Sequence, residues 1–396
     1  MKILVLNCGS SSLKYQFINM LNETVLSKGL CERIGTPKAV LKHESPKEIS
    51  KEMQMNDHKE AIKHVIDILL DSTYGVITNT NEVFAVGHRV VHGGEFFNKS
   101  AIITEEIYKA IEDCSSLAPL HNPSNLMGID ACSALLPSVG QVAVFDTAFH
   151  QTMPEKAFLY ALPISYYEKY KIRRYGFHGT SHKYVSAKVA EFIKKPIESL
   201  KIITCHLGNG ASLCAINNGK SVDTSMGFTP LEGLVMGTRS GDLDPAIIPY
   251  LCNKENMSPK EVENMLNKNS GVFGLSSGIS HDFRDLENAA ADGDENAKNA
   301  LDVYFYRVAK YIGQYTAVLN GVDIIVFTAG LGENSSYARQ SICSYLGYLG
   351  IALDSENNEI RGKIIKISTD NSTTDVYVVP TNEELVIARD TKSLLG

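Results

Sequence analysis

The chain repeats one local pattern at two widely separated places. Residues 3–18 contain an apolar run, a turn of small residues at 8–12, and a second run in which apolar and polar residues alternate. Residues 202–216 contain the same succession around a turn at 208–212. Each pattern is typical of two strands joined by a tight turn. One such hairpin at the start of each half predicts a duplicated fold.

The length and the remaining patterns favour two α/β domains. A chain of 396 residues exceeds what one hydrophobic core usually organises, so we expect two domains with a cleft between them. Apolar residues recur at helical spacing in 58–72 and 296–320. Short apolar runs, typical of strands buried on both faces, occupy 82–87, 141–145 and 324–328. Polar groups that follow such strands meet in a crevice, so they are the first candidates for function.

Composition excludes several classes of protein. The net charge of −7 argues against a nucleic-acid surface, which would be basic. No stretch approaches the roughly 20 apolar residues of a membrane span. Residues 3–6 have the pattern of a strand, and we do not expect a signal peptide there. The eight cysteines never form C-x-x-C, so we expect reduced thiols rather than disulfides or zinc. We therefore expect a cytosolic protein that contacts neither nucleic acid nor membrane.

Two turns of small residues and one further Gly-rich segment suit phosphate groups. Gly, Ser and Asn let a backbone approach phosphate oxygens closely, although hairpin turns are made of the same residues. In the first turn, Ser10 and Ser12 offer hydroxyls, and Lys14 just beyond it favours phosphate. A third segment, 330–334, follows an apolar strand and precedes a helix expected near Ser335. It lacks the last glycine of the Rossmann motif, and the chain contains no P-loop motif, so both of these nucleotide folds are disfavoured.

Two arginines and one histidine lie among small residues. Arg89 directly follows a predicted strand, and Arg239 lies between Thr238 and Ser240; a guanidinium there can bind a carboxylate or phosphoryl group in a bidentate manner. A structural ion pair is the alternative for either arginine. His178 and His182 have the spacing of helical zinc ligands. The helix is expected to start near His182, which leaves His178 in a loop as a donor to a ligand.

Three oxygen-bearing side chains follow predicted strands. Asp146 ends the strand at 142–145, Glu383 follows the strand at 376–379, and Asn7 ends the first strand. Mg²⁺ on phosphoryl-transfer enzymes is usually held by one or two carboxylates, with waters and substrate phosphates. The three side chains therefore form a candidate magnesium site, and each acid could instead be a helix cap or turn residue.

Over its whole length, the chain resembles the acetate kinases. The motifs that carry the resemblance are Asn7-Cys-Gly-Ser-Ser-Ser-Leu-Lys14, His88-Arg-Val-Val-His-Gly-Gly94, His121-Asn-Pro-Ser-Asn125, the segment 145–154, Tyr175-Gly-Phe-His-Gly-Thr-Ser-His182, His206-Leu-Gly-Asn-Gly210, the segment 236–245 and Thr381-Asn-Glu-Glu-Leu385.

The resemblance implies a duplicated ribonuclease-H-like fold, shared with sugar kinases, Hsp70 and actin, with nucleotide in the interdomain cleft. We expect one domain at 1–150, a nucleotide-binding domain at 151–382, and 383–396 packed back on the first. The implied activity is reversible transfer of the γ-phosphoryl group of ATP to acetate, giving acetyl phosphate and ADP. A homodimer and Mg²⁺ or Mn²⁺ are also implied.

By motif matching, the resemblance assigns a role to each candidate residue. Catalytic roles fall to Asp146, His178 and Arg239, metal binding to Asn7 and Glu383, and carboxylate binding to Arg89. An apolar pocket for the methyl group is assigned to Val91, Leu120, Phe177 and Pro230, with His121 beside it. Nucleotide contacts are assigned to Lys14, His206, Leu207, Gly208, Asn209, Gly210, Asp282, Phe283, Arg284, Gly330, Leu331, Gly332, Glu333 and Asn334.

The predicted mechanism is electrostatic. A carboxylate acceptor is already ionised at neutral pH and needs no general base. We expect Arg239 and His178 to stabilise the transferring phosphoryl group, and Asp146 to position Mg²⁺ or arginine side chains. A propionate or butyrate kinase differs only in pocket size. An actin- or Hsp70-like ATPase would not need the two arginines, and a sugar kinase would need a base and a polar pocket.

Overall fold

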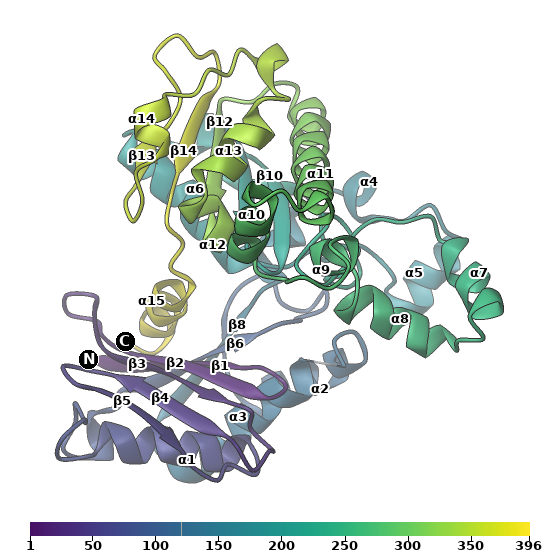
Figure 1. The fold of residues 1–396 in the computed structure, drawn as a ribbon. Coiled ribbons are helices and arrows are strands. Elements are labelled where there is room, and N and C mark those ends of the chain that lie inside the picture. Colours follow the sequence, from purple (N-terminus) through teal and green to yellow (C-terminus); the bar gives the residue numbers. More distant parts are fainter. Residues whose placement is uncertain (120) are drawn as a thin grey trace. The chain divides into compact units, whose positions relative to one another are not determined.

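The computed structural model describes residues 1–119 and 121–396 (Figure 1). Two compact units divide the chain. Unit 1 comprises residues 1–151 and 382–396, and unit 2 comprises residues 152–381. Within the described residues, no helix is both long and apolar enough to cross a membrane.

Unit 1 is built on one mixed sheet with the strand order β5-β4-β3-β2-β1-β6-β8-β7. Strands β1 to β5 are antiparallel neighbours, whereas β6 and β8 run parallel to β1. The strands are β1 Lys2–Cys8, β2 Ser12–Asn19, β3 Thr24–Glu32, β4 Val40–Glu44, β5 Glu48–Glu52, β6 Ala85–Val90, β7 Ala101–Ile102 and β8 Gly140–Phe145.

Unit 2 repeats this topology in the order β11-β10-β9-β12-β14-β13. In both sheets, the first strand of an antiparallel hairpin has two further strands on its other side, and these run parallel to it. The strands are β9 Lys201–Leu207, β10 Ala211–Asn217, β11 Lys220–Thr224, β12 Ile324–Thr328, β13 Ile365–Lys366 and β14 Asp375–Val378. The repetition confirms the duplicated α/β fold that the two hairpins predict.

The two hairpin turns form because their small residues permit tight closure. In unit 1, Cys8 pairs with Leu13, and the Gly9 N–H donates to the Ser12 carbonyl over 2.8 Å. In unit 2, Leu207 pairs with Ala211, and the Gly208 N–H donates to the Gly210 carbonyl over 3.2 Å. Each turn therefore lies at the carboxyl end of a central strand, where groups from the parallel neighbours also end.

Helices pack against the sheet of unit 1. α1 packs on α3, whereas α15 packs on β1, β6 and β8. A Cβ at Gly87 in β6 would lie 2.6 Å from the Ile387 side chain in α15, so this close approach requires glycine. The helices of the unit are α1 His58–Leu69, α2 Glu105–Asp113, α3 Asn122–Leu135 and α15 Glu383–Leu395.

The core of unit 2 is organised by its longest helix, α11 Glu295–Leu319. Its start is capped by Asp294, and Asn320 ends it in the left-handed conformation. The other helices are α4 Glu155–Phe158, α5 Ile164–Tyr170, α6 Gly179–Phe192, α7 Ile247–Lys254, α8 Pro259–Lys268, α9 Gly271–Leu275, α10 Phe283–Ala291, α12 Ala329–Asn334, α13 Ser336–Cys343 and α14 Ser355–Asn358.

Two predicted element boundaries are wrong. The strand expected at 82–87 runs from 85 to 90, because Glu82 belongs to a 3₁₀ turn and its carboxylate accepts from the Thr78 N–H. Arg89 therefore lies inside β6 rather than after it. The helix expected from His182 begins at Gly179, with His178 as its N-cap residue. The Gly-rich segment 330–334 belongs to the short helix α12, and the helix expected near Ser335 follows it with Ser335 as its N-cap.

Candidate active site

An ion pair between a partly exposed arginine and a buried aspartate lies at the carboxyl ends of β6 and β8 in unit 1. The Arg89 guanidinium donates from Nε to Asp146 Oδ1 over 2.9 Å and from Nη2 to Asp146 Oδ2 over 2.5 Å. Its Nη1 lies 3.4 Å from the amide oxygen of Asn7, at the end of β1. Three residues far apart in the sequence thus meet because their strands are neighbours in the sheet.

Asp146 holds Arg89 in its charged form. Asp146 is 1% exposed. Burial disfavours the charge on Arg89, but the charge and hydrogen bonds of Asp146 outweigh burial, so the pKa of Arg89 lies above its ordinary value. Both Asp146 oxygens accept from Arg89. Asp146 therefore orients the guanidinium and is poorly placed to carry a proton.

Glu383 opens α15 beside this pair. Burial raises the pKa of Glu383 to about 7; the positive charge of Arg89 opposes the rise, and the negative charge of Asp146 adds to it. The nearby positive charge therefore does not offset the effect of burial on the charged Glu383 carboxylate. A dication would supply that charge, and the donors of Asn7 and Glu383 are oxygens, as Mg²⁺ prefers. Within residues 1–119 and 121–396, no three His, Cys, Asp or Glu side chains form a metal cluster.

Two buried asparagines hold the loop after β6. The Asn125 amide oxygen accepts from the Val91 N–H over 3.1 Å, and its amide nitrogen donates to the Cys8 carbonyl over 2.9 Å. The Asn122 oxygen accepts from the His92 N–H over 3.1 Å. Sequence reasoning left both asparagines without a role. Their position on either side of proline, at the start of a helix, was the available signal.

His88, in the same motif as Arg89, is neutral in the folded protein. It is 2% exposed, and its Nε2 lies 2.7 Å from Gln141 Oε1. Burial lowers the pKa of His88 to about 4. The charge of this motif at neutral pH is therefore that of Arg89.

Replacing His88 should remove one acid-sensitive group. The unfolded chain binds a proton near pH 6.5 and the folded chain only near pH 4, so His88 lowers stability as pH falls through that window. Glu383, whose pKa is raised on folding, changes stability with pH in the opposite direction. Because both proteins contain Glu383, comparing the parent with the His88→Gln variant cancels its contribution. Urea unfolding measures the free energy of unfolding of both proteins. As pH is lowered from about 7 to 5, the value for the variant should rise by roughly 2 kcal/mol relative to that of the parent. A difference independent of pH would contradict the assignment.

In unit 2, His178 lies at the start of α6. Its backbone is left-handed, with φ of 56°. The ring stacks on His206 in β9, with centroids 4.2 Å apart, and its Nδ1 lies 2.9 Å from the Ser212 hydroxyl. The His206 Nδ1 lies 2.8 Å from the Ser181 hydroxyl. His178 therefore lies at the N-cap of α6, and its Nδ1 faces Ser212.

Arg239 and His178 converge on the turn after β9. A Cβ at Gly210 would lie 3.5 Å from His178 Nε2 and 3.6 Å from Arg239 Nη1. The Arg239 Nη1 also donates to the Pro230 carbonyl over 3.2 Å. Both side chains therefore direct nitrogen atoms toward the same small space beside Gly210.

The loop that carries Arg239 is tightly held. The Met236 N–H donates to the Arg239 carbonyl, and the Gly237 N–H donates to the Asn209 carbonyl over 2.9 Å. A Cβ at Gly237 would lie 1.6 Å from the Asn209 side-chain oxygen. Asp242 closes the loop, because its Oδ1 accepts from the Gly233 N–H over 2.8 Å.

An alanine at position 210 should separate folding from activity. The added Cβ contacts His178 and Arg239 at ordinary van der Waals distances, so Gly210→Ala should change the free energy of unfolding by no more than about 1 kcal/mol. It fills the space where the two nitrogen donors converge, so kcat should fall at least tenfold. Gly347→Ala is the matched control, since a Cβ there meets nothing within 4 Å. Equal kcat in both variants would contradict this placement of the site.

A cavity of about 610 Å³ opens beside this turn in unit 2. Its size falls in the range of small-molecule sites. Of the predicted nucleotide residues, it is lined by Gly208, Asn209, Asp282, Phe283, Arg284, Gly330, Leu331 and Asn334. The structure adds residues that sequence reasoning missed, namely His281, Glu287, Ser335 and Arg361. Arg361 follows a surface helix, and its local sequence gives no signal of a ligand.

Other predicted nucleotide residues do not line this cavity. Leu207 is fully buried in the core. The Glu333 carboxylate accepts from the backbone N–H groups of Ala329 and Thr381 over 2.7 and 3.0 Å, which is a structural role. Gly332 accepts a hydrogen bond at its carbonyl from the buried Arg339. His206 is 7% exposed and lies under the ring of His178.

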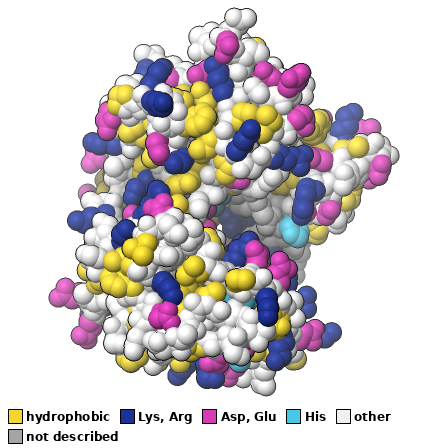
Figure 2. All heavy atoms as spheres, turned by 90° about the vertical axis from the view of Figure 1, so that its left-hand side faces the viewer, with side chains coloured by type: hydrophobic (Ala, Val, Ile, Leu, Met, Phe, Trp, Pro, Cys, Tyr) yellow, Lys and Arg dark blue, Asp and Glu magenta, His cyan; other side chains and the backbone are white. Residues whose placement is uncertain are grey.

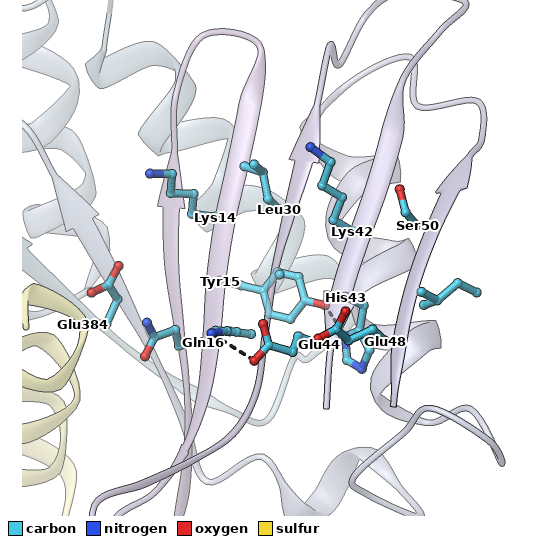
Figure 3. Close-up of a pocket in the computed structure, with 13 residues that line it drawn as sticks. Lys14, Tyr15, Gln16, Leu30, Lys42, His43, Glu44, Glu48, Ser50 and Glu384 are labelled. Atoms are coloured by element: carbon cyan, nitrogen blue, oxygen red, sulfur yellow. Dashed lines mark hydrogen bonds and ion pairs between the residues drawn. The ribbon is translucent and has the colours of Figure 1, made fainter. Parts of the chain in front are cut away.

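Lys14 lies on the exposed face of the unit 1 sheet. Figure 3 shows its side chain on β2, pointing out of the sheet, with Leu30 and Lys42 on the strands beyond. Glu384 lies at the same concave face. The predicted hydroxyls differ in place: Ser10 belongs to the turn, whereas Ser12 begins β2 and accepts at its carbonyl from Gly9.

The residues predicted to form a methyl pocket are each placed within their own unit. Val91 is 6% exposed in unit 1, and Phe177 is 2% exposed in unit 2. Pro230 is partly exposed and bonds to Arg239 through its carbonyl. His121 caps α3 in unit 1. Leu120 lies outside the described residues.

Known proteins resemble this chain along its full length. The model of the acetokinase family matches residues 2–389. The acetate kinase of Natranaerobius thermophilus is 61% identical over all of both chains. Among solved structures, the acetate kinase of Porphyromonas gingivalis matches with a TM-score of 0.96 and 47% identity, covering 100% of each chain. A propionate kinase from Francisella tularensis matches with a TM-score of 0.93 and 43% identity, covering 99% of each chain. The chain therefore belongs to the acetokinase family.

Proposed function

We propose that this enzyme transfers the γ-phosphoryl group of ATP to acetate and catalyses the reverse reaction. The observation that carries the proposal is the convergence of Arg239 Nη1 and His178 Nε2 on Gly210, beside the cavity that Gly208 and Asn209 line. Donors placed there suit a phosphoryl group whose nucleotide occupies the cavity. The name shared by the full-length relatives supports acetate as acceptor.

The reaction needs charge stabilisation rather than a base. Acetate is ionised at neutral pH, so its oxygen can attack the γ-phosphorus directly while the bond to the ADP oxygen breaks. Arg239 and His178 donate to the equatorial oxygens, where negative charge spreads in the transition state. Arg89, oriented by Asp146, binds the carboxylate of acetate. Mg²⁺ held by Asn7 and Glu383 would neutralise phosphate charge.

One assay tests the activity. Pure protein is incubated with ATP, Mg²⁺ and acetate, propionate or butyrate, and hydroxylamine traps any acyl phosphate. We expect acetyl hydroxamate and a smaller yield from propionate, because one methylene in an apolar pocket changes binding by only about 1 to 3 kcal/mol. No hydroxamate with any acid would refute the proposal. A kcat/KM for propionate equal to or above that for acetate would favour the second candidate, propionate kinase, which the Francisella relative supports.

We also propose a homodimer in the cytoplasm. Two short helices of unit 2 expose apolar side chains: Ile164, Tyr166 and Tyr170 in α5, and Ile247 and Tyr250 in α7. Figure 2 shows one face of the molecule, on which apolar side chains lie among charged ones.

All eight cysteines are free thiols, which suits a reducing compartment such as the cytoplasm. Light scattering after gel filtration should give twice the chain mass; the mass of a single chain would refute the dimer.

A further inference from the structure

A buried hydroxyl joins the two histidines at the start of α6. The Ser212 Oγ lies 2.9 Å from His178 Nδ1 and 2.8 Å from His182 Nε2. The other nitrogen of His182, Nδ1, lies 2.7 Å from the Thr204 hydroxyl. Thr204, His182 and Ser212 are all fully buried. These contacts form a continuous chain of four side chains that ends at His178, the Thr204–His178 chain.

The direction of these hydrogen bonds decides which nitrogen of His178 carries a proton. A serine hydroxyl has one proton, so it donates to one imidazole and accepts from the other. If Ser212 donates to His178 Nδ1, the neutral ring keeps its proton on Nε2. His182 then donates from Nε2 to Ser212 and accepts at Nδ1 from Thr204. If the bonds run the other way, the neutral ring has no proton on Nε2.

The opposite end of the His178 ring selects between these directions. The Cε1–Nε2 edge of the ring faces the space beside Gly210 that Arg239 Nη1 also faces. A phosphoryl oxygen in that space requires a hydrogen-bond donor at Nε2. The reversed direction would supply that donor only on a protonated ring, as an imidazolium. The first direction supplies it on a neutral ring.

We propose that Ser212 is a positioning residue, which donates to His178 Nδ1 and so holds the Nε2–H group toward the transferring phosphoryl group. His182 and Thr204 complete the chain by fixing the direction of the Ser212 hydroxyl. The proposal rests on the proposed function. No catalytic motif identifies this role from sequence, because Ser212 follows the glycine turn as the second residue of an ordinary buried strand.

The first test compares kinetics as a function of pH. Ser212→Ala should lower kcat by about 10- to 100-fold and change KM much less, since the lost orientation matters in the transition state. Without the Ser212 donor, the two neutral forms of His178 interconvert, and protonation restores a donor at Nε2. The ratio of variant to parent kcat should therefore rise as pH is lowered from about 8 to 6. A ratio near one, or one that is constant with pH, would overturn the proposal.

Matched variants protect this test against a folding defect. Thr204→Val keeps the shape of a buried side chain and removes the last donor of the chain, so it should show the same pH trend with a smaller effect. Ser186→Ala also removes a buried serine hydroxyl from α6, one that donates to the Lys183 carbonyl in the same helix. It should leave kcat and its pH profile unchanged. Equal behaviour of Thr204→Val and Ser186→Ala would overturn the role of the chain.

A spectroscopic test is independent of turnover. Long-range ¹H–¹⁵N correlation spectra of the parent protein report which ring nitrogen of each histidine is protonated, and the His178→Gln variant identifies the signals of His178. We expect a neutral His178 ring with its proton on Nε2. A proton on Nδ1 of the neutral ring would overturn the proposal. If the parent made no acyl hydroxamate, the proposed function would fail, while this spectrum would still decide the positioning by Ser212.

Discussion

Arg239→Ala should lower kcat by about 10²- to 10³-fold while the protein stays folded. The guanidinium supplies donors at Gly210 that a transferring phosphoryl group needs most in the transition state, and loss of one such donor costs this much in enzymes. The variant loses the bond from Arg239 Nη1 to the Pro230 carbonyl, but the N–H groups of Met236 and Gly237 still hold the loop. Steady-state kinetics with saturating ATP and acetate measure the effect.

Two further variants make this result specific. Arg239→Lys should recover part of the rate, since an ammonium keeps the charge but lacks the planar fork of donors. Arg389→Ala removes another bidentate guanidinium, which bonds to Glu23 on the surface of unit 1 over 2.8 and 2.6 Å. Its kcat should equal that of the parent. Near-normal turnover in Arg239→Ala would rule out the role of Arg239.

Arg89→Gln should impair both stability and acetate binding. It leaves the buried Asp146 carboxylate without its bidentate partner, which should reduce the free energy of unfolding by about 3 kcal/mol. Loss of a charge-assisted contact to the carboxylate should raise the KM for acetate roughly 10- to 100-fold. Urea unfolding and initial-rate kinetics measure the two effects separately.

The double variant Arg89→Gln/Asp146→Asn separates these two causes. Replacing both charges with amides removes the uncompensated buried charge, so stability should return to within about 1 kcal/mol of the parent. The KM for acetate should stay raised, because no cation binds the substrate. Recovery of normal KM together with stability would show that Arg89 is only a structural partner of Asp146.

Local sequence patterns were sufficient for most of the fold. The two hairpins appear at β1–β2 and β9–β10, and the helical spacing at 58–72 and 296–320 corresponds to α1 and α11. The strand ending at Phe145 places Asp146 at the carboxyl end of a central strand, as expected. These patterns predict the elements correctly because the spacing of apolar residues indicates whether one or both faces of a helix or strand are buried. Boundaries were less reliable where a polar turn, such as that at Glu82, interrupts an apolar run.

The partners of the polar groups were decided only by the tertiary structure. The sequence alone determined that Arg89, Asp146, His178 and Arg239 are candidates, through their positions after strands and glycines and through the family motifs. It did not show that Asp146 accepts two hydrogen bonds from Arg89. Nor did it show that Asn125 bonds to the backbone of Val91 and Cys8, or that the Ser212 hydroxyl contacts both His178 and His182. Each of these contacts depends on which strands and helices become neighbours. Spacing along the chain records burial but not neighbours, because strand order is set by the packing of the whole unit.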